Sequence, residues 1–121
     1  MMIVDDSEES RFLLKDFLLI NGHNVVAEAS DGIEALEKYY SEKPELMFLD
    51  LAMPKLDGLS VLKKIRLQDP TSKIIVITGN DAIDIFEECI RLGALAFITK
   101  PINLNDVLTA ISYSDELIIM K

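Results

Sequence analysis

The sequence has little positive charge and little cysteine, and each shortage excludes a class of protein. Lys and Arg contribute only 12 residues against 21 Asp and Glu, so the formal net charge is −9. A nucleic-acid-binding domain needs clustered cations to neutralise phosphates, so this composition argues against nucleic acid binding by this domain. The one cysteine, Cys89, cannot form an internal disulfide, which is typical of proteins in a reducing compartment.

Long hydrophobic runs are missing as well. No apolar stretch approaches the roughly 18 residues that a membrane-spanning helix needs, and the N-terminus has no signal-peptide pattern. Apolar residues still make up 50% of the 121 residues and charged residues 27%, as in ordinary globular domains. The sequence therefore predicts one cytoplasmic domain over residues 1–121, with no membrane partner.

Short apolar runs alternate with helical patterns along the whole chain. Strands are expected at residues 1–4, 24–30, 46–49, 73–78 and 94–99, and the middle ones are apolar enough to be buried on both faces. A helical spacing of apolar residues follows each run. This alternation predicts an α/β fold, a doubly wound five-stranded parallel sheet with right-handed crossovers and helices on both faces.

Capping residues delimit the expected helices. Ser7, Asn80 and Asn103 are suited to begin helices, and Asn21-Gly22 and Gly93 are suited to end them. The last helix is expected to continue toward Met120. The apolar residues at helical spacing are Phe12, Leu13, Phe17 and Ile20 in the first helix and Ile33, Leu36 and Tyr40 in the second.

Acidic residues follow two of the expected strands. Asp5 and Asp6 end the first strand, and Asp50 ends the third. Parallel strands present their C-terminal ends to one edge, so a sheet in which the first and third strands are neighbours would bring these three acids together. Three carboxylates in one pocket need a cation, because like charges raise one another's pKa. Hard oxygen ligands in an open crevice suit Mg²⁺.

Two further strand ends carry polar groups that suit phosphate. Asp50 could act as a carboxylate nucleophile toward phosphorus, as in aspartyl-phosphate chemistry. Lys100 would supply a positive charge and Thr78 a hydroxyl donor for phosphoryl oxygens, while Gly79 leaves the entrance open. Each residue also has an ordinary explanation, as a helix cap, a strand residue or a surface lysine. Their joint occurrence at one sheet edge favours phosphoryl chemistry.

Several motifs make the chain resemble the receiver domains of two-component response regulators, the CheY-like proteins. These motifs are Val4-Asp5-Asp6, Leu49-Asp50 followed by Met53-Pro54 and Asp57-Gly58, Ile77-Thr78-Gly79, and Thr99-Lys100-Pro101. The resemblance covers essentially the whole chain. It implies the flavodoxin-like strand order 2-1-3-4-5.

The resemblance also implies a role for each site residue. Asp50 is then the phosphoacceptor, which takes a phosphoryl group from a phosphohistidine on a sensor histidine kinase or histidine phosphotransfer protein, or from a small phosphodonor. The implied Mg²⁺ ligands are Asp5, Asp6, Asp50 and the backbone carbonyl of Ala52. The other implied roles are a switch formed by Thr78 and Phe97, a counter-charge on Lys100 and a cis peptide bond before Pro101.

Three positions depart from the commonest pattern of such domains. Phe97 has no hydroxyl group, so the switch would depend on packing. Ala52 and Asn80 flank the expected path of the hydrolytic water and are therefore candidate modulators of phosphate lifetime. The domain would assist its own phosphorylation and dephosphorylation and would not be an enzyme in the ordinary sense.

Other uses of this fold fit the sequence less well. A haloacid-dehalogenase-type phosphohydrolase needs a second Asp where Ala52 stands, and the acidic loop after the first strand would repel a flavin phosphate. The remaining alternative is a receiver-like interaction module that no longer cycles phosphate. A downstream protein, an output domain or a second copy of the chain would bind the fourth helix, last strand and last helix. These elements carry apolar residues beyond one buried stripe, namely Ile83, Ile85, Phe86 and residues 117–120.

Overall fold

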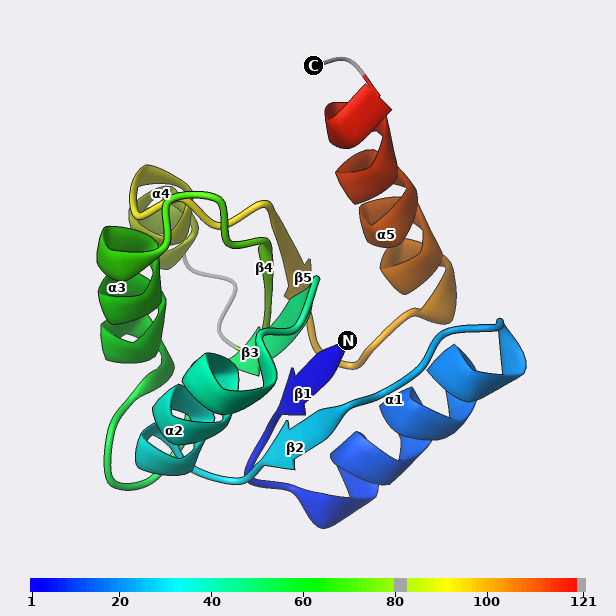
Figure 1. Ribbon diagram of the computed structural model, residues 1–121, viewed down its shortest axis with the longest axis horizontal. Helices are drawn as coiled ribbons and strands as arrows, with labels where there is room; N and C mark the ends of the chain where they lie inside the picture. The colour runs from blue at the N-terminus through cyan, green and yellow to red at the C-terminus, as the bar shows by residue number, and fades with distance from the viewer. Residues whose placement is uncertain (80–82, 120–121) are drawn as a thin grey trace.

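The computed structural model describes residues 1–79 and 83–119, with side chains described as far as Ser114. Five strands alternate with five helices in this part of the chain (Figure 1). The strands are β1 (Met2–Val4), β2 (Ala27–Ala29), β3 (Met47–Asp50), β4 (Ile74–Thr78) and β5 (Ala96–Thr99). The helices are α1 (Glu8–Ile20), α2 (Gly32–Glu42), α3 (Gly58–Gln68), α4 (Ile83–Arg91) and α5 (Leu104–Ile119).

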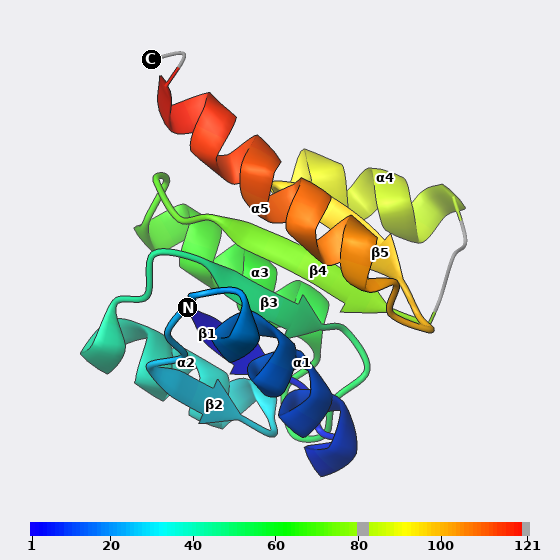
Figure 2. The same cartoon turned by 90° about the vertical axis from the view of Figure 1, so that its right-hand side faces the viewer.

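The sheet is parallel throughout and has the order β2-β1-β3-β4-β5. Helices α1 and α5 cover one face, and α2, α3 and α4 cover the other (Figures 1 and 2). The prediction of a doubly wound flavodoxin-like sheet of order 2-1-3-4-5 is therefore confirmed. None of the described helices is long and apolar enough to cross a membrane.

The sheet separates two apolar clusters, because successive strand residues point to opposite faces. On β3, Met47 and Leu49 join the cluster under α2, α3 and α4, whereas Phe48 joins the cluster under α1 and α5. All three side chains are almost completely buried. Cys89 of α4 lies in the first cluster, as a core residue. Each continuous apolar run of the sequence therefore contributes side chains to both apolar clusters.

Side-chain caps fix the starts of three helices. The Ser7 hydroxyl accepts a hydrogen bond from the backbone N–H of Ser10, and the carboxylates of Asp31 and Asp57 do the same at α2 and α3. The prediction for Ser7 is confirmed. The predicted cap Asn80 and the predicted helix end at Met120 lie outside the described residues.

The predicted apolar face of α1 is wrong for three of its four residues, since only Phe17 packs against the core. The helix buries Leu14 and Leu18, whereas Phe12, Leu13 and Ile20 are 66%, 61% and 76% exposed. Apolar residues occur on several sides of this helix, so more than one stripe fits a helical spacing.

The predicted face of α2 is displaced in the same way, and of its three residues only Leu36 packs against the core. This helix buries Ala35 and Tyr39, and leaves Ile33 and Tyr40 half exposed. The predicted second strand is also too long. Residues 24–26 precede β2, although the N–H of Val26 still donates to the Met1 carbonyl.

A close approach between β3 and α3 places the end of the third strand. A Cβ atom at Gly58 would collide with the carbonyl oxygen of Asp50 and the Cα atom of Leu51. The N–H of Gly58 donates to the Leu51 carbonyl over 3.0 Å. Glycine at this position therefore lets α3 begin directly against the strand that carries Asp50.

Candidate functional site

The candidate site lies at the C-terminal edge of the sheet. Val4 of β1 is paired with Leu49 of β3, so Asp5 and Asp50 are the next residues on adjacent parallel strands. On the other side of β3, Thr78 ends β4 and is paired with Thr99 of β5, directly before Lys100. The strand ends therefore bring these residues to one rim, as the sequence pattern predicts.

Three carboxylate groups cluster at this rim. Asp5, Asp6 and Asp50 each offer an oxygen that lies within 4.8 Å of the other two. Asp5 and Asp50 are only 5% and 4% exposed, whereas Asp6 faces solvent. Oxygens that share one Mg²⁺ ion lie about 2 Å from the metal, hence at most about 4 Å apart. The all-oxygen donor set and its spacing therefore fit a small divalent cation with little rearrangement.

The backbone N–H, the carbonyl and the carboxylate of Asp5 all form hydrogen bonds. Its backbone N–H donates to the Ala29 carbonyl over 3.0 Å, and its carbonyl accepts from Nη1 of Arg11 over 2.7 Å. Its carboxylate accepts from the N–H of Ser7 at 2.9 Å and from Nζ of Lys100 at 3.0 Å. This residue is thus a fixed point of the site.

Burial and neighbouring acids make Asp50 a weak acid. Desolvation first, and then the negative charge of Asp5, raise the pKa of Asp50 to about 6. Nζ of Lys100, 3.5 Å from its Oδ2, and the N–H of Ala52, 3.3 Å from its Oδ1, limit that rise. The carboxylate is therefore mostly ionised at neutral pH and takes up a proton in mildly acidic solution.

Lys100 is placed between two acids by the chain that follows β5. Its N–H donates to the Thr78 carbonyl over 2.8 Å, and the Lys100–Pro101 peptide bond is cis. Burial lowers the pKa of Lys100, but its hydrogen bond to Asp5 and the charge of Asp50 raise the pKa by more, so the net shift is upward. Lys100 therefore remains a cation in the site.

The remaining predicted residues lie around this centre. Thr78 is buried at the end of β4, while the exposed Gly79 has open space where a Cβ would stand. Ala52 is exposed beside Asp50. Phe97 is half-buried on β5 and meets the ring of Phe86 edge to face, with ring centroids 5.4 Å apart. Asn80 lies outside the described residues.

Arg11 is a site residue that the sequence pattern did not reveal. Its side chain contacts a backbone carbonyl, so the sequence contains no complementary side chain that would predict the contact. Its position on α1, three and seven residues before the buried Leu14 and Leu18, is the one signal that it points toward the sheet.

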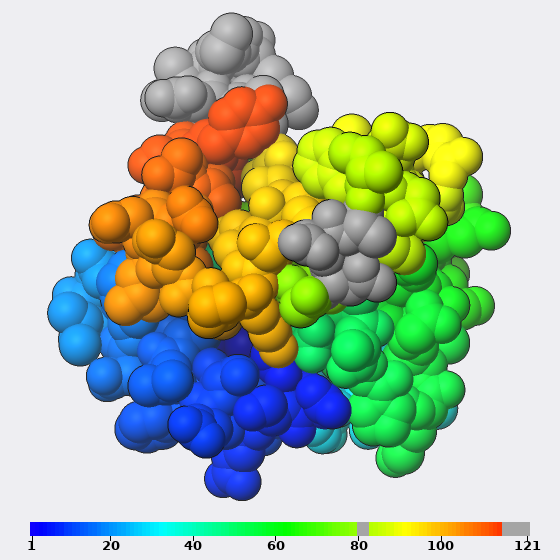
Figure 3. All heavy atoms as spheres, turned by 180° about the vertical axis from the view of Figure 1, so that it is seen from behind, coloured from blue at the N-terminus to red at the C-terminus, as the bar shows by residue number. Residues whose placement is uncertain are grey.

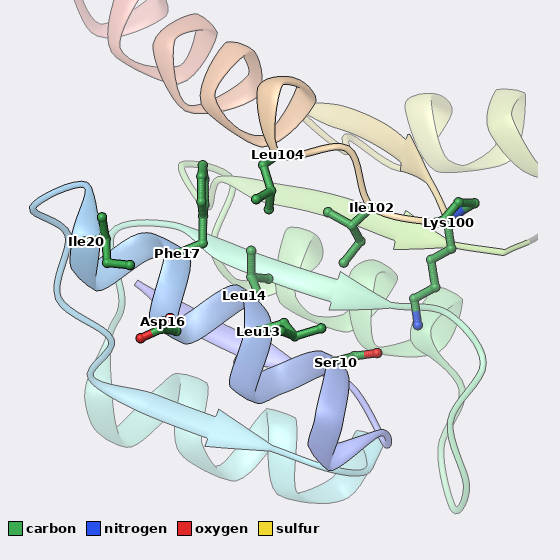
Figure 4. A pocket seen from close by; sticks show the side chains of 10 residues that line it. Ser10, Leu13, Leu14, Asp16, Phe17, Ile20, Lys100, Ile102 and Leu104 are labelled. Atoms are coloured by element: carbon green, nitrogen blue, oxygen red, sulfur yellow. The ribbon is translucent and has the colours of Figure 1, made fainter.

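An apolar groove adjoins the site. It has a volume of about 520 Å³ and lies between α1 and the segment that joins β5 to α5 (Figure 4). Leu13, Phe17 and Ile20 line it from α1, Ile102 and Leu104 line it from the other side, and Lys100 stands at one end. The exposed side chains of α1 thus form one wall of a continuous hollow.

Comparison with known proteins gives a consistent result. The response regulator receiver domain model matches residues 1–112. Chemotaxis protein CheY of Bacillus subtilis is 39% identical over 112 residues, covering 93% of this chain and 93% of that protein. Sporulation initiation phosphotransferase F of the same organism is 31% identical over 92% of this chain and 89% of that protein.

Solved structures agree. CheY in the CheX–CheY–BeF3–Mg²⁺ complex from Borrelia burgdorferi superposes with a TM-score of 0.88 at 33% identity, over 91% of this chain and 84% of that one. A CheY-like receiver domain protein from Methanospirillum hungatei gives a TM-score of 0.90 at 30% identity, over 99% and 96% of the two chains. With its motifs, its strand order and its acidic rim, the chain belongs to the response regulator receiver domain family, the signalling domains of two-component systems.

Proposed function

We propose that this receiver domain accepts a phosphoryl group on Asp50. The observation that carries the proposal is the meeting of Asp5, Asp6, Asp50 and Lys100 at one rim, with carboxylate oxygens within 4.8 Å of one another. An oxygen of Asp50 would attack the phosphorus of a phosphohistidine. The P–N bond would break and its electron pair would return to the imidazole.

The acids and the carbonyl of Ala52 would hold Mg²⁺. Asp5 is already oriented by Ser7, Arg11 and Lys100, and Asp6 faces the solvent from which an ion arrives. A bound Mg²⁺ would neutralise negative charge shared by the acids and the phosphoryl oxygens.

Lys100 and Thr78 would bind the phosphoryl oxygens. The Lys100 ammonium group lies between Asp5 and Asp50, so it can donate a hydrogen bond to a phosphoryl oxygen on Asp50. Thr78 ends the neighbouring strand and supplies a hydroxyl group. Ala52 and Asn80 are the candidate positions for control of phosphate lifetime. The domain would thus assist its own phosphorylation and dephosphorylation without acting on a separate substrate.

A protein phosphodonor would dock in the apolar groove beside α1. The donor is a sensor histidine kinase or a histidine phosphotransfer protein, and it has to present its phosphohistidine at the rim. The groove runs from Ile20 to Lys100, so a partner with an apolar ridge seated there would reach the acceptor. Asp16 is the acid in the lining, which favours a basic residue on that ridge.

The switch would change the surface formed by α4, β5 and α5. Figure 3 shows β5 at the surface between these two helices. Ile83, Phe86 and Ile90 of α4 and Tyr113 of α5 are exposed there, and β5 and α5 line a hollow of about 410 Å³. A downstream protein, an output domain or a second copy of the chain would bind this surface. Leu117, Ile118 and Ile119 have no described side chains, and Met120 lies outside the described residues.

Phe97 would connect the site to that surface. Movement of Thr78 toward a phosphoryl group would leave space that the Phe97 ring can occupy, and its contact with Phe86 would then change. No observation in the described part of the chain favours a module that no longer cycles phosphate. We take residues 1–121 as one receiver domain working in the cytoplasm.

Intact-mass spectrometry after incubation with acetyl phosphate tests the proposal. Wild type should gain one phosphoryl group in the presence of Mg²⁺, and should gain none when the metal is removed before the reaction. Asp50→Asn should gain none, whereas Asp16→Asn, an exposed acid on α1, should react as wild type does. An unmodified wild type, or a modified Asp50→Asn variant, would contradict the assignment.

A further inference from the structure

Arg11 joins the acid-bearing loop to the edge of the sheet. Its side chain is only 17% exposed, and its Nη1 donates to the carbonyl oxygen of Asp5 over 2.7 Å. Its Nε lies 3.5 Å from Oε1 of Glu28 on β2. A guanidinium group can serve both partners because its N–H groups point in fixed, divergent directions.

The contact with Asp5 fixes the direction in which Asp6 leaves the strand. The carbonyl of Asp5 and the N–H of Asp6 belong to one planar peptide group. A hydrogen bond that holds the carbonyl therefore holds the whole plane, including the Cα atom of Asp6. Among the described residues, no donor holds the carboxylate of Asp6 itself, so its placement depends on the backbone.

Glu28 in turn keeps Arg11 in place. Its Oε2 accepts from Nζ of Lys15 at 3.0 Å, and its backbone carbonyl accepts from Nζ of Lys38 at 2.6 Å. Glu28 also sits opposite Ile3 in the ladder between β2 and β1. Both ends of the Arg11 bridge are thus anchored in the sheet that carries the acids.

We propose that Arg11, held by Glu28, is a positioning residue that presents Asp5 and Asp6 to a divalent cation. The inference rests on the proposed magnesium site and adds to it the residue that orients its two first-strand ligands. Residues behind a metal's direct ligands commonly change metal affinity by about 10–100-fold when they are removed.

The charge of Arg11 and its proposed positioning role predict opposite changes in Mg²⁺ affinity when Arg11 is removed. Arg11 is a cation near the acids, so by Coulomb's law its removal should make the site more attractive to Mg²⁺. If Arg11 positions Asp5 and Asp6, its removal should weaken Mg²⁺ binding in spite of that gain. A purely structural role would lower the stability of the metal-free protein and leave the Mg²⁺ affinity of the folded fraction unchanged.

Isothermal titration with MgCl₂ distinguishes these cases. For Arg11→Gln we expect a loss of Mg²⁺ affinity of about tenfold. Arg11→Lys keeps the charge but carries all its N–H groups on one nitrogen, so it cannot reach Asp5 and Glu28 as the planar guanidinium group does, and it should lose part of the Mg²⁺ affinity. Lys63→Gln removes an exposed cation of α3 that is paired with neither Glu28 nor Asp5, and should bind as tightly as wild type or slightly more tightly. The amide NMR signal of Asp6 in metal-free protein should shift in Arg11→Gln and stay in place in Lys63→Gln.

Each outcome decides between the alternatives. Mg²⁺ affinity in Arg11→Gln equal to or above that of Lys63→Gln would overturn the role of Arg11 while the magnesium site stands. Failure of wild type to bind Mg²⁺ would instead overturn the site and the inference together. If Arg11→Gln does not fold, Glu28→Gln keeps the Asp5 contact but loses the anchor. Because this variant also removes a negative charge, its loss of Mg²⁺ affinity is compared with that of Glu9→Gln, which removes an exposed acid of α1. A larger loss in Glu28→Gln supports the proposal, and an equal or smaller loss rejects it.

Discussion

The ammonium nitrogen of Lys100 lies 3.0 Å from Oδ2 of Asp5, in an ion pair between the ends of β5 and β1. These strands are not neighbours, since β3 and β4 lie between them. The lysine side chain therefore spans the rim of the sheet and passes Asp50 on the way, 3.5 Å from its Oδ2. One cation thus pairs with both buried acids.

Removal of this cation should make Asp50 a weaker acid. Lys100 lowers the pKa of Asp50, so Lys100→Gln should raise that pKa above its present value of about 6. The carboxyl ¹³C signal of Asp50 followed by NMR against pH measures the change in metal-free protein. Lys63→Gln, an exposed lysine on α3, should leave the titration where it is. An Asp50 pKa that falls or stays constant in Lys100→Gln would show that the lysine does not act on this carboxyl group.

The raised pKa of Asp50 should appear in the stability of the metal-free protein. Because the folded pKa of about 6 exceeds the ordinary aspartate value of 3.8, the native state binds more protons than the unfolded chain between about pH 4 and 6. The contribution of Asp50 to stability therefore falls as the pH rises through that window. Asp50→Asn removes this loss and should be more stable than wild type at pH 7, by up to about 3 kcal/mol.

Urea denaturation in EDTA at several pH values measures this effect. The difference between wild type and Asp50→Asn should be small near pH 4 and should grow up to about pH 6 to 7. Asp16→Asn removes the same formal charge from an exposed position and should show no such growth. A constant difference across the range would mean that Asp50 is not the group responsible.

Gly58→Ala should disturb the acceptor strand. The new methyl group would collide with the backbone of Asp50 and Leu51, so α3 or the end of β3 has to move. Overpacking of this kind costs about 1–3 kcal/mol, measurable by urea denaturation. Gly79→Ala is the matched control because the added carbon meets nothing within 4 Å. Equal stabilities of the two variants would show that the close approach is not required.

Phe97→Ala should separate phosphorylation from its output. Phe97 is paired with Val76, two residues before the end of β4, and its ring packs on Phe86, so the variant should still gain a phosphoryl group by intact mass. The change in amide NMR signals of α4 that phosphorylation causes in wild type should shrink or vanish. Phe12→Ala, an exposed aromatic on α1, is the control and should keep both responses. Loss of phosphorylation itself in Phe97→Ala would refute this division of roles.

The rim of the sheet was predictable from sequence because it depends on a topological rule. Once β1 and β3 are neighbours, Asp5 and Asp50 have to meet, whatever the surrounding loops do. The apolar face of α1 was not predictable in the same way. Leu13 and Leu14 are adjacent and chemically identical, and only the sheet decides that Leu14 is buried and Leu13 exposed.

The role of Arg11 could not be predicted from the sequence for a different reason. Its partner in the site is the carbonyl of Asp5, a group that every residue carries, so the sequence contains no complementary side chain to notice. Glu28, its other partner, is on a short strand whose start was misplaced by pattern alone. Side-chain motifs identify groups that could react, whereas the contacts that orient them depend on backbone geometry.

The separation of the two apolar clusters by the sheet has a thermodynamic consequence. Met47 and Phe48 are consecutive in the chain yet share no cluster, so truncations of the two side chains remove contacts from different sets of neighbours. Sites that share no partners usually couple little, so we expect the effects of the two truncations on stability to add. Helices α1 and α5, beside the apolar groove, can therefore accumulate substitutions while the opposite layer keeps its own packing intact.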